Sequence, residues 1–255
     1  MATQGANVRW LWEQRDIFSN VTGMKPIIDI NFDFRSDTPP GKDPDAHSKT
    51  LRQYHKTLWS KELPCGDRLE LRDDVRGHYL HHKSGIGEFS LSSDAVIPTF
   101  RWNETVKSFI SAEDLEDFNS AGYTIGGMMV FPGNCINRQW TINQARGCTK
   151  RIGDRFDLTL ECIRQHYSGG ENPLSKVLAR YADFFALFVD FRGYVEFFHL
   201  HDLVSADFSA VKISLPFNDF TGPPIPSNVE EYRAYENDAR QFISARNQRI
   251  LQCQE

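Results

Sequence analysis

The sequence has no long apolar run, no cysteine motif and no excess of basic residues, and each absence excludes a class of protein. No stretch approaches the ~20 consecutive apolar residues of a transmembrane helix, and the first residues contain no signal-peptide core. The five cysteines form no CxxC pair, which favours free thiols in a reducing compartment over a zinc module or a disulfide framework. The formal net charge of -5 does not favour non-specific duplex binding. We therefore expect a cytoplasmic protein that does not span a membrane.

Several catalytic signatures are also missing. The chain contains no GxGxxG, GxxxxGK[ST], GxSxG or HExxH sequence. These absences disfavour classical dinucleotide-binding folds, P-loop enzymes, α/β hydrolases and zincins.

What the chain has is ample apolar material for a packed core. Hydrophobic residues make up 40% of the 255 residues, with 19 phenylalanines among them, which excludes a disordered chain. Strand patterns dominate residues 1–150 and helical patterns dominate residues 151–255. Because strands and helices do not alternate cleanly, we predict an α+β fold, as a single domain over residues 1–255.

Individual elements follow from apolar periodicity and from capping residues. Helices are predicted over 8–16, 49–60, 111–119, 154–167, 172–188 and 227–251. Strands are predicted over 28–35, 68–72, 78–82, 85–98, 124–134, 136–142 and 193–200. Residues 142–147 are predicted to form a polar loop.

The segment IIDINFDFRSDTPPGKDPD, residues 27–45, is the first candidate for a functional site. Apolar and polar residues alternate strictly over 28–35, which is typical of a half-buried strand. Its polar face carries Asp29, Asn31, Asp33 and Arg35. Asp and Asn are poor strand formers, so this face is interpreted either as a charged edge strand or as the floor of a site.

The acids of this segment suggest a metal-dependent nuclease or phosphohydrolase. Carboxylates suit Mg²⁺ or Mn²⁺, and the candidate ligands, with His55 as a possible nitrogen donor, are Asp29, Asp33, Asp37 and Asp43. On a strand, however, Asp29 and Asp33 would lie roughly 13 Å apart, too far to share one ion. The alternative is a set of solvated acids with an ion pair between Asp33 and Arg35.

A second hypothesis comes from the order of three polar positions along the chain. Arg35 on an early strand, Ser90-Leu91-Ser92 on a middle strand and Glu196 on a late one resemble the Arg–Ser–Glu layout of ADP-ribosyltransferases. The resemblance implies that NAD binds, that Arg35 holds its diphosphate and that Ser90 and Ser92 shape the pocket.

It also implies that Glu196 is catalytic, although the Glu or Gln that many members carry two positions earlier is absent. His55 or Arg52 would replace Arg35 if the early strand is misassigned. The substrate would be a macromolecule such as nucleic acid.

As a whole, the sequence resembles an uncharacterised bacterial family, a domain of unknown function. The resemblance covers roughly residues 27–250. It is carried by the blocks FDFRSDTPPGKDPD, YHKTLWSKELPCG, GEFSLSSDAVIPTF, GGMMVFPGN, TINQARG and DRFDLTLECIRQHY. It implies one bacterial domain, of a kind found with toxin or phage-defence genes.

Three functions are therefore expected as alternatives. The first is an ADP-ribosyltransferase-like toxin or defence enzyme that uses NAD. The second is the metal-dependent nuclease or phosphohydrolase. The third is a non-enzymatic binding module whose polar segment contacts a protein partner, such as an antitoxin or another subunit of a complex.

Overall fold

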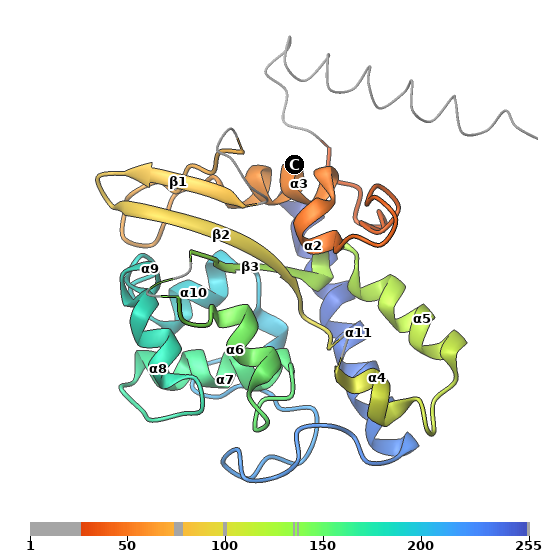
Figure 1. Cartoon of the computed structure of the whole chain (residues 1–255). Helices are drawn as coiled ribbons and strands as arrows, with labels where there is room; N and C mark the ends of the chain where they lie inside the picture. Colours follow the sequence, from red (N-terminus) through yellow and green to blue (C-terminus); the bar gives the residue numbers. More distant parts are fainter. Residues whose placement is uncertain (1–26, 74–78, 99–100, 135, 137, 254–255) are drawn as a thin grey trace, which may run out of the picture.

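The computed structural model describes residues 27–73, 79–98, 101–134, 136 and 138–253 (Figure 1). The helix expected over 8–16 lies outside these residues. Within them the fold is α+β, as predicted, with its sheet in the N-terminal half and mostly helices afterwards. None of the helices in this part of the chain combines the length and the apolar character that crossing a membrane requires.

The sheet has three antiparallel strands in the order β1-β2-β3. They are β1 (Leu80–Ser84), β2 (Gly87–Ala95) and β3 (Met128–Pro132). A tight turn joins β1 to β2, and the two strands pair from Ser84 with Gly87 to Leu80 with Leu91. Strand β3 is buried along its whole length. These strands confirm the strands expected over 85–98 and 124–134 at shorter lengths, and the strand expected over 78–82 lies two residues later, as β1.

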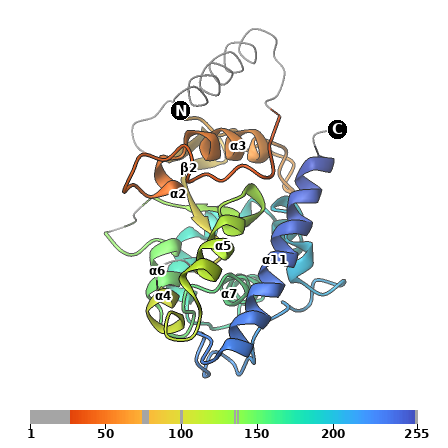
Figure 2. The ribbon, with the colours of Figure 1, turned by 90° about the vertical axis from the view of Figure 1, so that its right-hand side faces the viewer.

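Helices cover both faces of the sheet (Figure 1). One face carries α2 (Pro44–His47) and α3 (Lys49–Trp59). The other faces α6 (Ile142–Cys148), α7 (Phe156–Tyr167), α8 (Ser175–Leu178), α9 (Ala182–Ala186) and α10 (Phe191–Phe197). Along one end run α4 (Arg101–Val106), α5 (Ala112–Gly122) and α11 (Val229–Gln252), as Figure 2 shows. Short 3-10 turns lie at Ile125–Gly127, Ala179–Tyr181 and His201–Leu203.

The strand predicted over 28–35 is wrong, because this segment forms consecutive turns. The side chains of Asp29 and Asp33 accept hydrogen bonds from the backbone N–H groups of Asn31 and Arg35. Such local bonds compete with strand pairing and explain why Asp recurs here. The apolar positions were assigned correctly at both ends, since Ile28 and Phe34 are buried.

Two predictions around residue 142 are also wrong. The residues described between 136 and 141 contain no strand, and the polar loop expected over 142–147 is helix α6. Thr141 and Gln144 form a complete capping box at its start. That signature stands in the sequence as T-I-N-Q and outweighs the polar composition that favours a loop.

The strand predicted over 193–200 is helix α10, which begins where the Asp190 side chain accepts a bond from the Gly193 N–H. Residues 172–188 are not one helix but α8, a 3-10 turn and α9. Residues 68–72 make isolated bridges at Arg68 and Arg72 rather than a strand. The helices predicted over 49–60, 111–119, 154–167 and 227–251 are confirmed as α3, α5, α7 and α11, within a few residues at their ends.

The long helix α11 lies very close to Gly126, in the 3-10 turn just before strand β3. A Cβ atom there would lie 2.4 Å from the Ile243 carbonyl oxygen, so glycine is required. Close by, the fully buried guanidinium of Arg246 donates to the carbonyl oxygens of Phe198, Gly126 and Met128. No carboxylate among the described residues pairs with it, and burial lowers the pKa of Arg246 to about 9.

We expect Arg246→Met to lower the free energy of unfolding by about 3 kcal/mol or more, because it leaves buried carbonyl groups unsatisfied. Arg233→Met, on the same helix but exposed, should change stability by less than about 1 kcal/mol. Urea denaturation of both variants measures the difference. Equal losses of unfolding free energy would contradict the stabilising role of the hydrogen bonds that Arg246 donates to the buried carbonyl groups.

Candidate functional site

A cavity of about 220 Å³ lies between helix α2, strand β2 and the start of helix α6. Helix α2 and the residue that caps it contribute Asp45 and Asp43. Strand β2 contributes Ser92-Ser93-Asp94, and α6 contributes Asn143. The chain therefore brings three aspartates from two distant segments to one cavity.

Local hydrogen bonds set the position of each wall. The Asp43 carboxylate accepts from the backbone N–H of Asp45 and caps α2. The amide nitrogen of Asn143 donates to the Ser92 hydroxyl at 3.0 Å and to the Ser93 carbonyl at 3.2 Å. One oxygen of Asp45 and the amide oxygen of Asn143 are buried, without a hydrogen-bond partner among the described residues. Both atoms belong to residues that line the cavity and could accept a hydrogen bond.

The end of β2, which carries Asp94, is held in place by Arg146, which is fully buried. Its guanidinium donates to the Asp94 carboxylate at 2.6 Å and to the carbonyl oxygens of Ala95 and Asp154. The Asp154 carboxylate lies 3.2 Å away. Arg146 therefore fixes Asp94 and compensates part of its charge.

The two inner carboxyl groups influence each other's ionisation. Burial raises the pKa of Asp45 well above its ordinary value, and the charges of Asp94 and Asp43 raise it further. Burial also raises the pKa of Asp94, and Arg146 opposes that shift. Asp45 and Asp94 are thus a coupled pair that keeps a proton at a pH where a surface aspartate has lost it.

His55, a predicted catalytic residue, lies behind this cavity. Its Nδ1 atom is 3.0 Å from the Ser93 hydroxyl oxygen, and the ring is completely buried. Burial and the charge of Arg246 lower the pKa of His55 to about 3. Because the ring resists a second proton, His55 is a weak base for Ser93, and the contact fixes the strand.

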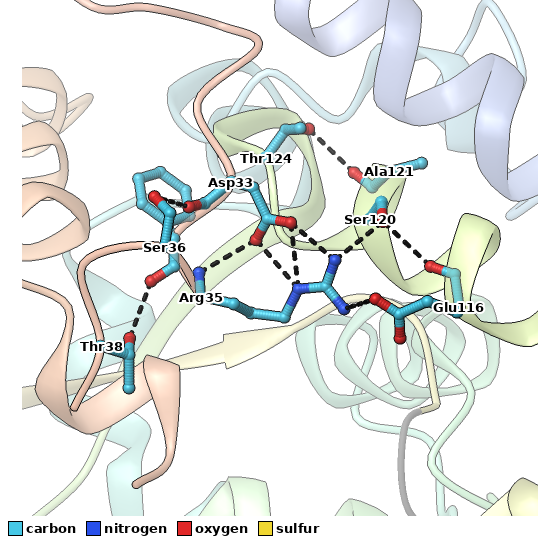
Figure 3. Close-up of polar contacts among 9 residues, drawn as sticks. Asp33, Arg35, Ser36, Thr38, Glu116, Ser120, Ala121 and Thr124 are labelled. Atoms are coloured by element: carbon cyan, nitrogen blue, oxygen red, sulfur yellow. Dashed lines mark hydrogen bonds and ion pairs between the residues drawn. The ribbon is translucent and has the colours of Figure 1, made fainter. Parts of the chain in front are cut away.

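Figure 3 shows the surroundings of Arg35, the predicted diphosphate ligand. Its guanidinium makes a two-point contact with Asp33, at 2.9 and 2.6 Å. It also donates to Glu116 at 2.7 Å and to Ser120 at 2.8 Å, both on α5. These contacts join the N-terminal turns to α5, and a diphosphate would have to displace them.

The other residues predicted to bind NAD or to be catalytic are dispersed. Glu196 lies on α10, where it accepts from Arg192, and its side chain is 45% exposed. Ser90 bonds to His81, and Arg52 donates to the Ala46 carbonyl. Ser92 lines the cavity. Of these residues the structure places Ser92 beside the acids.

The four acids predicted to bind a metal make separate local contacts. Asp29 and Asp33 bond within the turns described above, Asp37 accepts from the Thr50 N–H, and Asp43 caps α2. In the described ranges, no three Asp, Glu, His or Cys side chains are arranged to hold one ion. The Mg²⁺ or Mn²⁺ hypothesis stays a prediction without a site.

Sequence reasoning missed Asp94, Asn143 and Arg146. Two signals were available, namely an aspartate within the strand expected over 85–98 and the T-I-N-Q capping box. Neither signal shows that α6 folds back onto β2, and that contact creates the cavity.

These observations define an α+β protein with an acid-lined cavity at the end of a small sheet. The chain belongs to a family of unknown function, DUF6994, which it matches over residues 28–250. This confirms the resemblance to an uncharacterised family. No curated protein and no solved structure matches the chain.

We expect Asp45→Asn to raise the melting temperature near pH 8 by about 2 °C or more. A carboxyl group whose pKa is raised on folding contributes stability at low pH, and this is lost as the pH rises through the folded pKa. The variant and the wild type should converge near pH 4. Asp238→Asn, exposed on α11, should follow the wild type throughout, and an Asp45→Asn protein that does the same would contradict the coupled pair.

Proposed function

We propose that the protein is an enzyme that cleaves a glycosidic bond in the acid-lined cavity, and that NAD is the substrate to test first. The observation that supports the proposal is the pair of coupled carboxyl groups with different neighbours. Asp94 lies against Arg146, whereas Asp45 has a buried oxygen without a partner. When two carboxyl groups differ in this way, one serves as acid and the other as base or stabilising anion.

The roles follow from the charges. Asp45 keeps its proton and is the general acid, and Asp94 is the ionised partner. As the glycosidic bond breaks, Asp45 gives its proton to a leaving group that needs one, such as adenine, and the Asp94 carboxylate stabilises the positive charge that develops on the sugar. Asp94 then takes a proton from the attacking water or hydroxyl group, and exchange with solvent restores both groups.

Ser92 and Asn143 would orient the sugar. The Asn143 amide oxygen has no partner among the described residues and accepts a hydrogen bond, which suits a sugar hydroxyl. The Ser92 hydroxyl is already fixed by Asn143 at 3.0 Å. This arrangement replaces the role that the sequence assigned to Ser90 and Ser92 together.

The cavity size limits what enters it. Pockets for whole ligands are typically about 300–1,000 Å³, and this cavity measures about 220 Å³. It therefore accommodates one ring and its sugar rather than a complete dinucleotide. The rest of NAD, or of a longer nucleic acid, would lie outside.

NAD has two glycosidic bonds with different needs. Nicotinamide leaves as a neutral ring without an added proton, whereas adenine needs one. If both bonds react, Asp45→Asn should suppress adenine release more than nicotinamide release. Asp94→Asn should suppress both, because both pass through a positively charged sugar.

We expect the wild type to release nicotinamide or adenine from NAD, and Asp94→Asn to release it at least 10²-fold more slowly, as for other acid–base groups. Chromatography of the products measures this, and thermal unfolding confirms that the variant is folded. A reaction with labelled NAD and added nucleic acid identifies the acceptor. Label on the nucleic acid indicates an ADP-ribosyltransferase, and label only in small products indicates hydrolysis by water.

Glu196→Gln separates this proposal from the one based on the sequence order. It should remain active if the carboxyl pair carries the reaction, because Glu196 lies on α10 with Arg192. Loss of activity in Glu196→Gln with full activity in Asp94→Asn would favour the original assignment. No product from either bond of NAD would overturn the choice of substrate.

A further inference from the structure

We propose that a second groove, along helix α6, binds a nucleotide, with the base on Trp140 and the phosphate between Arg138 and Lys176. The groove has a volume of about 500 Å³, within the usual range for small-molecule sites. Its walls are residues 138–140, helix α6 at Ala145, and the consecutive α8 and 3-10 turn, which contribute Lys176 and Arg180. None of these residues belongs to the acid-lined cavity.

The charge of the groove selects an anion. Its lining includes Arg138, Lys176 and Arg180 and contains no acid, although the whole chain is negative. Within the described part of the chain, Arg138 and Lys176 have no ion-pair partner, and both are exposed. Two cations that line one groove without an ion-pair partner suit a phosphate, the anion that arginine and lysine side chains commonly bind.

Arg180 holds the groove in shape. Its guanidinium donates to the Trp140 carbonyl at 2.5 Å and to the Lys176 carbonyl at 3.0 Å. These two bonds connect the walls that carry the aromatic ring and the lysine. The Nε atom of Arg180 is buried and has no hydrogen-bond partner among the described residues, so one donor remains for a ligand.

The aromatic part comes from Trp140, a large hydrophobic residue that is 56% exposed. The groove floor beside it is apolar, with Leu174 and Val177. A planar aromatic ring packs on such a surface, and an indole face is a stacking platform for a nucleic-acid base. A ligand with a planar ring and a phosphate a few bonds away could contact both Trp140 and the cations Arg138 and Lys176.

The groove and the acid-lined cavity are consecutive along the chain. Residues 138–140 line the groove, and Thr141 and Asn143 line the cavity. A nucleotide in the groove thus lies beside the segment that forms the cavity wall. The groove assignment rests on its own residues and holds whether or not the cavity cleaves a glycosidic bond.

The test is calorimetric titration of the full chain with ADP, adenosine and inorganic phosphate at low salt. ADP should bind more tightly than adenosine or phosphate, and its affinity should fall as salt increases. Trp140→Ala and Lys176→Gln should each weaken ADP at least tenfold, whereas Trp140→Phe, which keeps a stacking ring, should retain most of the affinity. Lys107→Gln, an exposed lysine outside the groove, should bind as the wild type does.

A short single-stranded oligonucleotide distinguishes the two sources of this chemistry. Tighter binding than ADP with a steeper salt dependence would assign the groove to single-stranded nucleic acid. Binding of ADP alone would assign it to a free nucleotide. The proposal is overturned if ADP does not bind at millimolar concentration, or if Trp140→Ala and Lys176→Gln leave its affinity unchanged.

Discussion

The buried guanidinium of Arg146 is the interaction on which the arrangement of the candidate site depends. A charge removed from water must be paired and fully hydrogen-bonded, and Arg146 meets this requirement with Asp94, Asp154 and the Ala95 carbonyl. These partners belong to the end of β2 and to the chain between α6 and α7. The same contacts therefore seat α6 on the sheet and place one carboxylate at the cavity wall.

This pairing also gives the cavity its asymmetry. The Arg146 guanidinium opposes the rise in the pKa of Asp94. The pKa of Asp45, on α2, is raised by burial and by its acidic neighbours. Arg138, Lys176 and Arg180 line the second groove and do not line the cavity that contains the aspartates. Acidic and basic surfaces thus adjoin along one short segment, residues 138–144, which suits a ligand with a phosphate at one end and a sugar at the other.

The sequence predicted what depends on local patterns. Helical periodicity located α3, α7 and α11, and the alternation in residues 85–98 located β2. It failed where local bonds compete with a pattern, since Asp29 and Asp33 bond to their own backbone and turn a strand-like segment into turns. It also failed after Thr141, where the polar composition was interpreted as a loop although a capping box begins helix α6 there. The pair Asp45–Asp94 was beyond prediction because the two residues are nearly fifty positions apart in the sequence, and their contact is a property of the packed fold.

The central claim is that Asp45 and Asp94 retain a proton at a higher pH than ordinary aspartates do, because both of their pKa values are raised by burial. Titration of the aspartate carboxyl carbons by ¹³C NMR measures this directly, with Asp45→Asn and Asp94→Asn to assign the two signals. We predict two coupled transitions above the ordinary aspartate value, and a shift of the remaining transition when either partner is replaced. If every aspartate titrates at or below its ordinary value, the cavity holds two simple carboxylates, and the account of the site is wrong.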